Sequence, residues 1–161
     1  MGLLSFVREA GEKLFGRKDV EAAAAESAQD KLADLNQKAA AAIVAYIDKQ
    51  GLDTRALQVS FDGASSTVTV AGTVADQAIR EKVLLCCGNV EGVDKVDDQL
   101  TVINPEPPAT FHTVVRGDTL SAIAKACYGN ANAYMKIFEA NKPMLSDPNK
   151  IYPGQVLRIP A

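Results

Sequence analysis

The spacing of apolar residues along the chain predicts a mixed helix and strand fold. Residues 30–50 repeat apolar side chains at intervals of three and four, which is typical of a helix with one buried face, and Gly51 is a suitable end for it. Residues 57–61 alternate between apolar and polar positions, as a half-buried strand does. Residues 62–63 favour a turn, and residues 67–74 are expected to form the returning strand.

A second helix and a third strand complete this unit. Asp76 is suited to cap a helix that runs to about Cys87, and Gly88 ends it. Residues 93–102 then predict the last strand. The order helix–strand–strand–helix–strand indicates an α+β domain with its helices on one face of the sheet.

Two segments precede this domain. Residues 3–15 carry apolar side chains at helical spacings, interrupted at Gly11 and ended at Gly16, so we predict a short amphipathic helix. Residues 17–30 are rich in alanine and charge and have no apolar stripe, which favours a solvated helix or a linker.

A proline-rich spacer at 104–110 predicts a second domain after it. The pattern there indicates a strand, two helices and a closing strand at 111–115, 119–128, 133–141 and 155–159. The predicted division of the chain is an N-terminal amphipathic segment at 1–16, an Ala-rich helix or linker at 17–30, a first domain at 31–103, the spacer at 104–110 and a second domain at 111–161.

Charge and composition exclude several classes of function. The net charge is −3, with 11 basic and 16 acidic residues up to residue 105, so we expect no nucleic-acid partner. No apolar run is long enough for a signal peptide or a membrane span, and we expect a cytoplasmic protein. Three cysteines, two of them adjacent, fit reduced thiols, and we expect Cys86, Cys87 and Cys127 to be buried in helices.

An enzyme is not expected, because no nucleophile and base or paired catalytic carboxylates can be placed. His112 is the single histidine and is expected to lie on the surface. The adjacent Asp97 and Asp98 fall on a predicted strand and are expected to form a solvated edge.

The second domain resembles a LysM domain. The resemblance is carried by GDTL at 117–120, YG at 128–129, PGQ at 153–155 and LRIP at 157–160. It implies a β–α–α–β fold and binding of glycans that contain N-acetylglucosamine. The glycan would lie between the loop after the first strand and the loop after the second helix, at Gly117, Asp118, Thr119, Leu120, Asn141, Lys142, Pro143, Met144 and Ile151.

The first domain resembles a BON domain. The marks are VTVAGTV at 68–74 and VEGVDKVDDQL at 90–100. BON domains are associated with attachment to phospholipid or to the cell envelope. The order BON then LysM, together with FVREAGEKLFG at 6–16, resembles a family of small bacterial potassium-binding proteins. This resemblance implies a monomer that binds K⁺, for which Rb⁺ or Cs⁺ could substitute, as a sensor or buffer in osmotic stress.

A potassium site is best made from neutral oxygens, because K⁺ is large and weakly charged and carboxylate clusters favour Ca²⁺ or Mg²⁺ instead. A short helix broken near Gly11 would leave carbonyls without intrahelical partners at the negative end of its dipole. We therefore predict that K⁺ is held by backbone carbonyls of Val7, Ala10, Gly11, Lys13, Phe15 and Val90.

Three alternatives remain open at this stage. The N-terminal segment could dock on the sheet without any ion. The chain could be an adaptor that binds peptidoglycan through its LysM domain. It could also be an accessory to an enzyme or a fragment of a hydrolase, although the residues give this least support.

Overall fold

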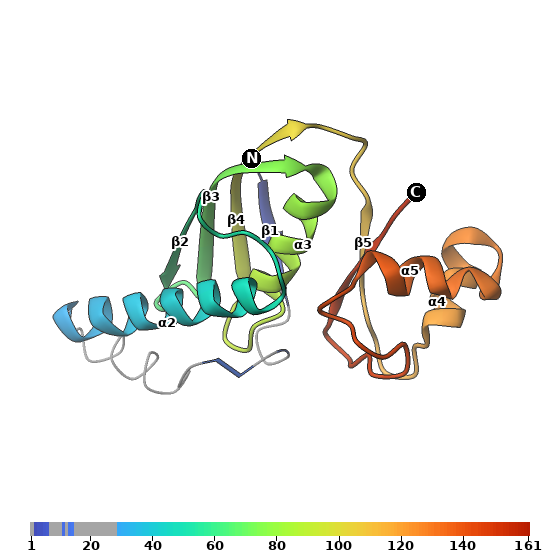
Figure 1. The fold of residues 1–161 in the computed structure, drawn as a ribbon. Helices are drawn as coiled ribbons and strands as arrows, with labels where there is room; N and C mark the ends of the chain where they lie inside the picture. The colour runs from blue at the N-terminus through green and yellow to red at the C-terminus, as the bar shows by residue number, and fades with distance from the viewer. Residues whose placement is uncertain (1, 7–10, 12, 15–28) are drawn as a thin grey trace.

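The computed structural model describes residues 2–6, 11, 13–14 and 29–161 of the chain. Two groups of elements are seen side by side in Figure 1, one around a four-stranded sheet and one around a two-stranded sheet. The first group comprises β1 (Gly2–Ser5), α2 (Gln29–Lys49), β2 (Leu57–Asp62), β3 (Thr67–Asp76), α3 (Gln77–Gly88) and β4 (Lys95–Asn104). The predicted α+β class is confirmed.

The strand order of the larger sheet is β1-β4-β3-β2. Strands β2 and β3 form the predicted hairpin, with Phe61 opposite Val68. Strand β4 runs parallel to β3, and α3 makes the crossover between them. The helix begins as predicted, because the Asp76 side chain accepts a hydrogen bond of 2.9 Å from the Ile79 N–H.

The helix predicted over residues 3–15 is wrong at its start, where the chain forms β1. Strand β1 pairs antiparallel with β4, with Leu4 opposite Val96. Leu4 and Phe6 lie on the inner side of the sheet, whereas the side chain of Leu3 is exposed. The apolar residues at the start of the chain are compatible with the period of a helix and with that of a strand. The strand forms because the edge of β4 supplies hydrogen-bond partners for it. Residues 7–10, 12 and 15–28 of the predicted N-terminal segments lie outside the described residues.

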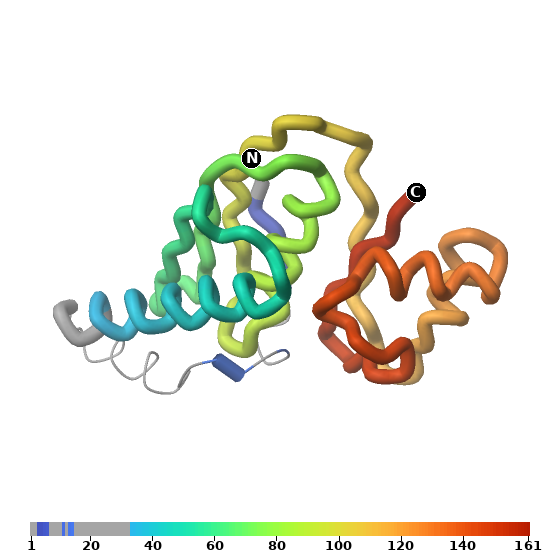
Figure 2. The backbone as a smooth tube through the Cα atoms, viewed as in Figure 1, coloured from blue at the N-terminus to red at the C-terminus, as the bar shows by residue number. Residues whose placement is uncertain are grey.

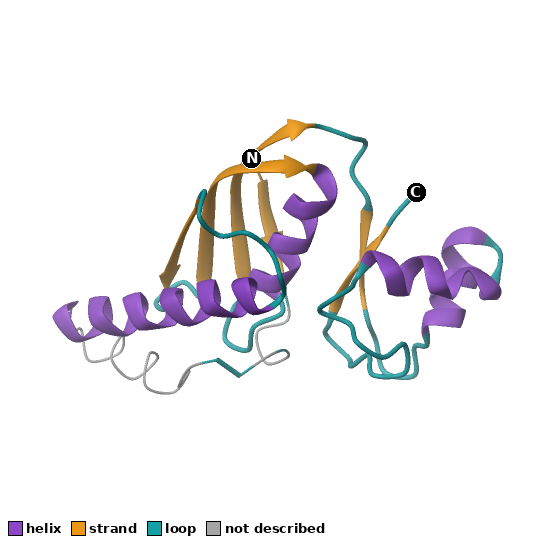
Figure 3. Ribbon diagram, viewed as in Figure 1, coloured by secondary structure: helices purple, strands orange, loops and turns teal. Residues whose placement is uncertain are grey.

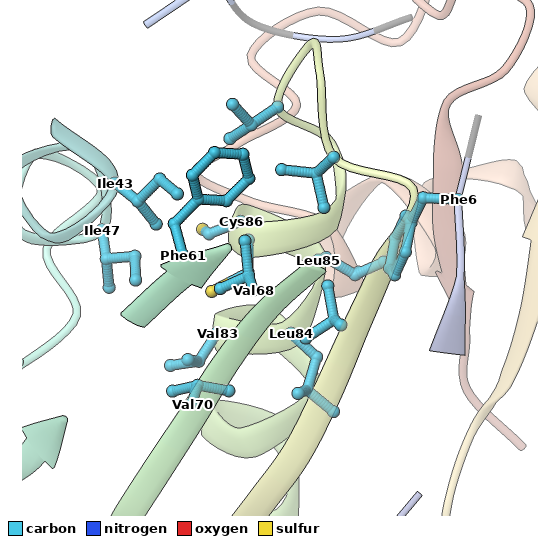
Figure 4. Packing of buried hydrophobic residues seen from close by; sticks show 14 of the residues in the cluster. Phe6, Ile43, Ile47, Phe61, Val68, Val70, Val83, Leu84, Leu85 and Cys86 are labelled. Atoms are coloured by element: carbon cyan, nitrogen blue, oxygen red, sulfur yellow. The ribbon is translucent and has the colours of Figure 1, made fainter. Parts of the chain in front are cut away.

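Helices α2 and α3 cover one face of the sheet (Figure 3). Ile43 and Ile47 of α2 are fully buried, and Figure 4 shows them beside Phe61. Cys86 and Cys87 of α3 are buried as predicted. Burial raises the pKa of Cys86 to about 12 and raises that of Cys87 as well, so both thiols stay protonated and pack as small apolar groups.

Two predictions about polar or reactive side chains fail in the structure. Cys127 is exposed, because it lies on the outer side of its helix. Asp98 is buried rather than solvated, and its carboxylate accepts hydrogen bonds of 2.9 and 2.5 Å from the Arg80 guanidinium. Arg80 comes from α3, so this ion pair ties the helix to the sheet.

The second group has a core of its own and follows the predicted β–α–α–β order. Thr119 begins α4 by accepting a hydrogen bond of 3.1 Å from the Ala122 N–H. A short 3₁₀ turn separates the two α-helices. The elements are β5 (Thr110–Thr113), α4 (Leu120–Tyr128), η1 (Ala131–Ala133), α5 (Tyr134–Ala140) and β6 (Val156–Ile159).

The two groups are joined by more than the spacer, whose path from β4 to β5 can be followed in Figure 2. Glu81 of α3 is 1% exposed, and its carboxylate accepts hydrogen bonds from three directions. The donors are the Arg158 guanidinium of β6, the Ala109 N–H of the spacer at 2.9 Å and the Gln77 carboxamide at 2.9 Å. Val156 of β6 also packs into the core of the first group. A buried carboxylate therefore binds the two units together.

We expect the substitution Arg158→Met to lower the free energy of unfolding by about 3 kcal/mol, because it leaves the buried Glu81 carboxylate without its cation. Urea unfolding of the full chain measures this change. The double variant Glu81→Gln/Arg158→Met should lose less unfolding free energy than Arg158→Met alone, because no buried charge is then left without a partner. A loss no larger than that of an exposed ion pair would contradict the prediction.

Candidate functional site

The C-terminal end of α3 receives the N-terminal segment of the chain. Gly88 ends the helix, and the Phe6 ring packs so closely on it that a Cβ at Gly88 would overlap the ring. Figure 4 shows Phe6 beside Leu85 and Leu84. The Phe6 N–H donates a hydrogen bond of 2.8 Å to the Asp94 carbonyl. These contacts fix where the N-terminal segment leaves the sheet.

Gly11 brings its backbone directly against the loop that follows α3. Its φ is +113°, and a Cβ there would overlap the Asn89 carbonyl oxygen and lie 3.1 Å from the Glu91 nitrogen. Glycine is therefore required at this position both for its backbone conformation and for its lack of a side chain. The Lys13 ammonium lies 3.9 Å from the carboxylate of Glu91 in the same loop.

This junction is a suitable place for a weakly charged cation. The last carbonyls of a helix lack intrahelical partners and carry the negative end of its dipole. The Val90 carbonyl accepts a hydrogen bond of 3.1 Å from the Val93 N–H and keeps a second lone pair. The helix end at this junction is that of α3, whereas the helix end predicted near Gly11 involves residues 7–10 and 12, which lie outside the described residues.

The structure brings some of the predicted potassium ligands together. Gly11, Lys13 and Val90 belong to or adjoin this junction, whereas Val7, Ala10 and Phe15 lie outside the described residues. Sequence reasoning identified Gly88 as the end of the helix but missed Asn89, whose side-chain partner Val156 is far away in the sequence. Within the described ranges, no group of three or more His, Cys, Asp or Glu side chains is placed to hold a metal ion.

A cleft of about 320 Å³ lies on the second group, between the start of α4 and the loop before β6. Of the residues predicted to bind glycan, Asp118, Thr119, Leu120 and Ile151 line it, and Gly117 directly precedes them. The remaining lining residues are Ser121, Tyr134, Pro148 and Asn149.

Four other predicted glycan residues do not line this cleft. Asn141 is 2% exposed, and its carboxamide is engaged by backbone groups of Ile137 and Arg158. Lys142 pairs with the Glu139 carboxylate at 2.8 Å and lies over the Phe138 ring, and its bond to Pro143 is cis. Met144 packs instead against the core of the first group.

Asp118 is the charged residue at the mouth of the cleft. Its hydrogen bond with His112, at 2.9 Å, lowers the pKa of the carboxyl group, and the Val115 N–H at 3.0 Å lowers it further. His112 is half-buried rather than a free surface residue, because of this contact. The pair holds the loop between β5 and α4 in place.

Comparison with known proteins gives two domain matches and one relative over the full length. Residues 32–104 match the BON domain family, and residues 112–160 match the LysM domain family. The chain is 46% identical over 160 residues to the potassium binding protein Kbp of Escherichia coli O6:H1, which covers 99% of each protein. The chain belongs to the Kbp family.

Other relatives share only part of their length with this member of the Kbp family. An uncharacterized protein of Deinococcus radiodurans is 49% identical over 51 residues, which is 32% of this chain and 19% of that protein. An esterase of Mycobacterium tuberculosis is 49% identical over 53 residues, which is 33% of this chain and 11% of the esterase. None of the described helices has the length and apolar character needed to cross a bilayer.

We expect Asp118→Asn to lower the melting temperature at pH 7. The pKa of Asp118 is lower in the folded protein, so its carboxylate stabilises the fold above the ordinary aspartate pKa of about 4, and this stability is lost as the pH falls through the folded pKa. The difference between the variant and the parent chain should therefore shrink below about pH 4. Melting curves from pH 3 to pH 7 measure it, and a constant difference over that range would contradict the prediction.

Proposed function

We propose that this chain is a K⁺-binding protein and that it holds the ion with backbone carbonyls at the junction of the N-terminal segment and the end of α3. The observation that carries the proposal is the close contact between the Gly11 backbone and the Asn89 carbonyl, in a chain 46% identical to a potassium binding protein. The carbonyls of Gly11, Lys13 and Val90 are the proposed ligands within the described residues, with Val7, Ala10 and Phe15 completing the set.

The charge balance at the junction suits a monovalent ion. The Glu91 carboxylate belongs to this loop, and the positive charge of the Lys13 ammonium lies 3.9 Å from it. A neutral shell of carbonyl oxygens binds K⁺ without the cost of removing several carboxylates from water, and it gives no advantage to a divalent ion. The dipole of α3 adds a partial negative charge at the same end.

We further propose a role as a sensor or buffer of K⁺ rather than as an enzyme. An ion that binds the folded chain but not the unfolded chain stabilises the fold by mass action, so occupancy would report the K⁺ concentration. Rb⁺ and Cs⁺ are the expected substitutes, since they are also large and weakly hydrated. The reduced cysteines fit a cytoplasmic setting.

Thermal unfolding in choline chloride buffer tests the proposal directly. Adding KCl to about 100 times the dissociation constant should raise the melting temperature by about 5 °C or more, because binding then contributes about 2.7 kcal/mol. RbCl should act similarly and NaCl should not. Identical melting curves in all salts at matched ionic strength would overturn the proposal.

A glycine pair gives a sharper test of the site. Gly11→Ala should weaken K⁺ binding at least tenfold in isothermal titration calorimetry, because the new Cβ overlaps the Asn89 carbonyl. Gly51→Ala is the matched control, since Gly51 also has a positive φ, of +77°, but a Cβ there meets nothing within 4 Å. Equal K⁺ affinity of the two variants would place the ion elsewhere.

A second function, glycan binding, is favoured by the cleft on the LysM domain. The cleft combines the polar side chains of Asp118, Thr119 and Asn149 with the ring of Tyr134. Sugars bind through polar edges and apolar faces, and both are present here. The chain would then act as an adaptor for peptidoglycan or related glycans.

Titration with N-acetylglucosamine oligomers tests this second function. Amide signals of residues 118–121 and 149–151 should shift in nuclear magnetic resonance spectra of the full chain, and Tyr134→Ala should reduce the shifts. Shifts spread evenly over the protein, or none at all, would count against a glycan site in this cleft.

A further inference from the structure

Asn89 touches the proposed ion site with its backbone and the LysM domain with its side chain. Its carbonyl faces Gly11, as described above. Its carboxamide forms two hydrogen bonds with Val156 of β6. The Val156 N–H donates to Oδ1 at 2.9 Å, and Nδ2 donates to the Val156 carbonyl at 2.9 Å.

These two bonds make Asn89 a substitute for a neighbouring strand. Strand β6 pairs with β5 on one side, and the N–H and carbonyl of Val156 point to the other side. Arg158 lies two residues further along β6, and the Asn141 carboxamide binds it in the same way. The Arg158 N–H donates to Oδ1 and Nδ2 donates to the Arg158 carbonyl, both at 2.8 Å. One asparagine therefore comes from within the LysM domain and the other from the BON domain.

The position of β6 restricts how the peptide between residues 89 and 90 can turn. The Asn89 N–H is held by the Leu85 carbonyl at 2.9 Å, and the side chain is held by Val156. These bonds hold the N, Cα and Cβ atoms of Asn89 in place, so its main-chain carbonyl can move only by rotation about the Cα–C bond. Loss of the Val156 contacts lets the Cα of Asn89 shift, and its carbonyl then moves away from Gly11 with it.

We propose that Asn89 is a positioning residue for K⁺ binding, through which the LysM domain sets the geometry of the ion-binding loop. The inference rests on the proposed function, since it concerns the same site. Because coupling between two sites is reciprocal, the ion also strengthens the hold of Asn89 on β6. The second domain then takes part in ion affinity and selectivity without contributing a ligand.

Calorimetric titration of the full chain with KCl and with NaCl, in choline chloride buffer, tests this role. Asn89→Ala should weaken K⁺ binding about fivefold or more, at the lower end of known coupling effects, and should lower the preference for K⁺ over Na⁺. A less firmly held carbonyl discriminates less between ions of different size. Loss of a residue that only stabilises the fold would leave the preference for K⁺ over Na⁺ unchanged. Asn89→Asp keeps one of the two hydrogen bonds to Val156, so its K⁺ affinity should lie between that of Asn89→Ala and that of the parent chain.

Glu81→Gln is the matched control, because it weakens the domain contact at Arg158 and leaves the loop after α3 untouched. It should lower the melting temperature but leave K⁺ affinity within about twofold of the parent. Equal losses of affinity in Glu81→Gln and Asn89→Ala would overturn the positioning role, and so would an unchanged Asn89→Ala. Absence of K⁺ binding in the parent chain would instead overturn the proposed function, and with it this inference.

Nuclear magnetic resonance of the unaltered chain provides a measurement that does not depend on a variant folding. Addition of KCl, but not of choline chloride, should shift the Val156 amide and the side-chain carboxamide of Asn89. Shifts at Gly11 with none at Val156 would show that the ion binds and that the coupling is absent.

Discussion

The end of α3 is where three stretches of the chain, far apart in sequence, come into contact, and the arrangement depends on the absence of side chains there. The Phe6 ring packs against Gly88, and the Gly11 backbone lies against the carbonyl of Asn89. From the other side, β6 of the LysM domain meets the Asn89 carboxamide. A methyl group at either glycine would separate the N-terminal segment from the loop. Close backbone packing is thus the constraint that brings the N-terminal segment to the loop after α3.

Polar groups in defined geometry contribute to the contact between the domains, beside the apolar packing of Val156. Glu81 is nearly inaccessible, and its partners come from its own helix, from the spacer and from β6. Buried ion pairs contribute little net stability compared with apolar packing, but they penalise every arrangement in which a charge is left alone. This property favours a single relative placement of the two domains.

Local patterns were sufficient to predict most of the fold and only part of the site. The helices and strands of both domains follow apolar periods that their own residues carry, and caps such as Asp76 are visible in the sequence. Strand β1 was mistaken for a helix because its pairing partners in β4 lie at least 90 residues away in the sequence. Glu81 and Asn89 were overlooked for the same reason, since their partners Arg158 and Val156 are 77 and 67 residues distant. A carbonyl site also leaves no side-chain signature.

The two asparagines that hydrogen-bond to β6, Asn89 and Asn141, have a consequence for how such chains can evolve. LysM domains are usually regarded as modules that can be exchanged between proteins. Here one edge of the module is completed by Asn89, which belongs to the preceding domain, and Arg158 of the same strand neutralises a carboxylate of that domain. A LysM domain from another protein would have to place a strand backbone against Asn89 and an arginine against Glu81 at the same time. We therefore expect the two domains of this family to have been inherited together rather than reassembled from separate sources.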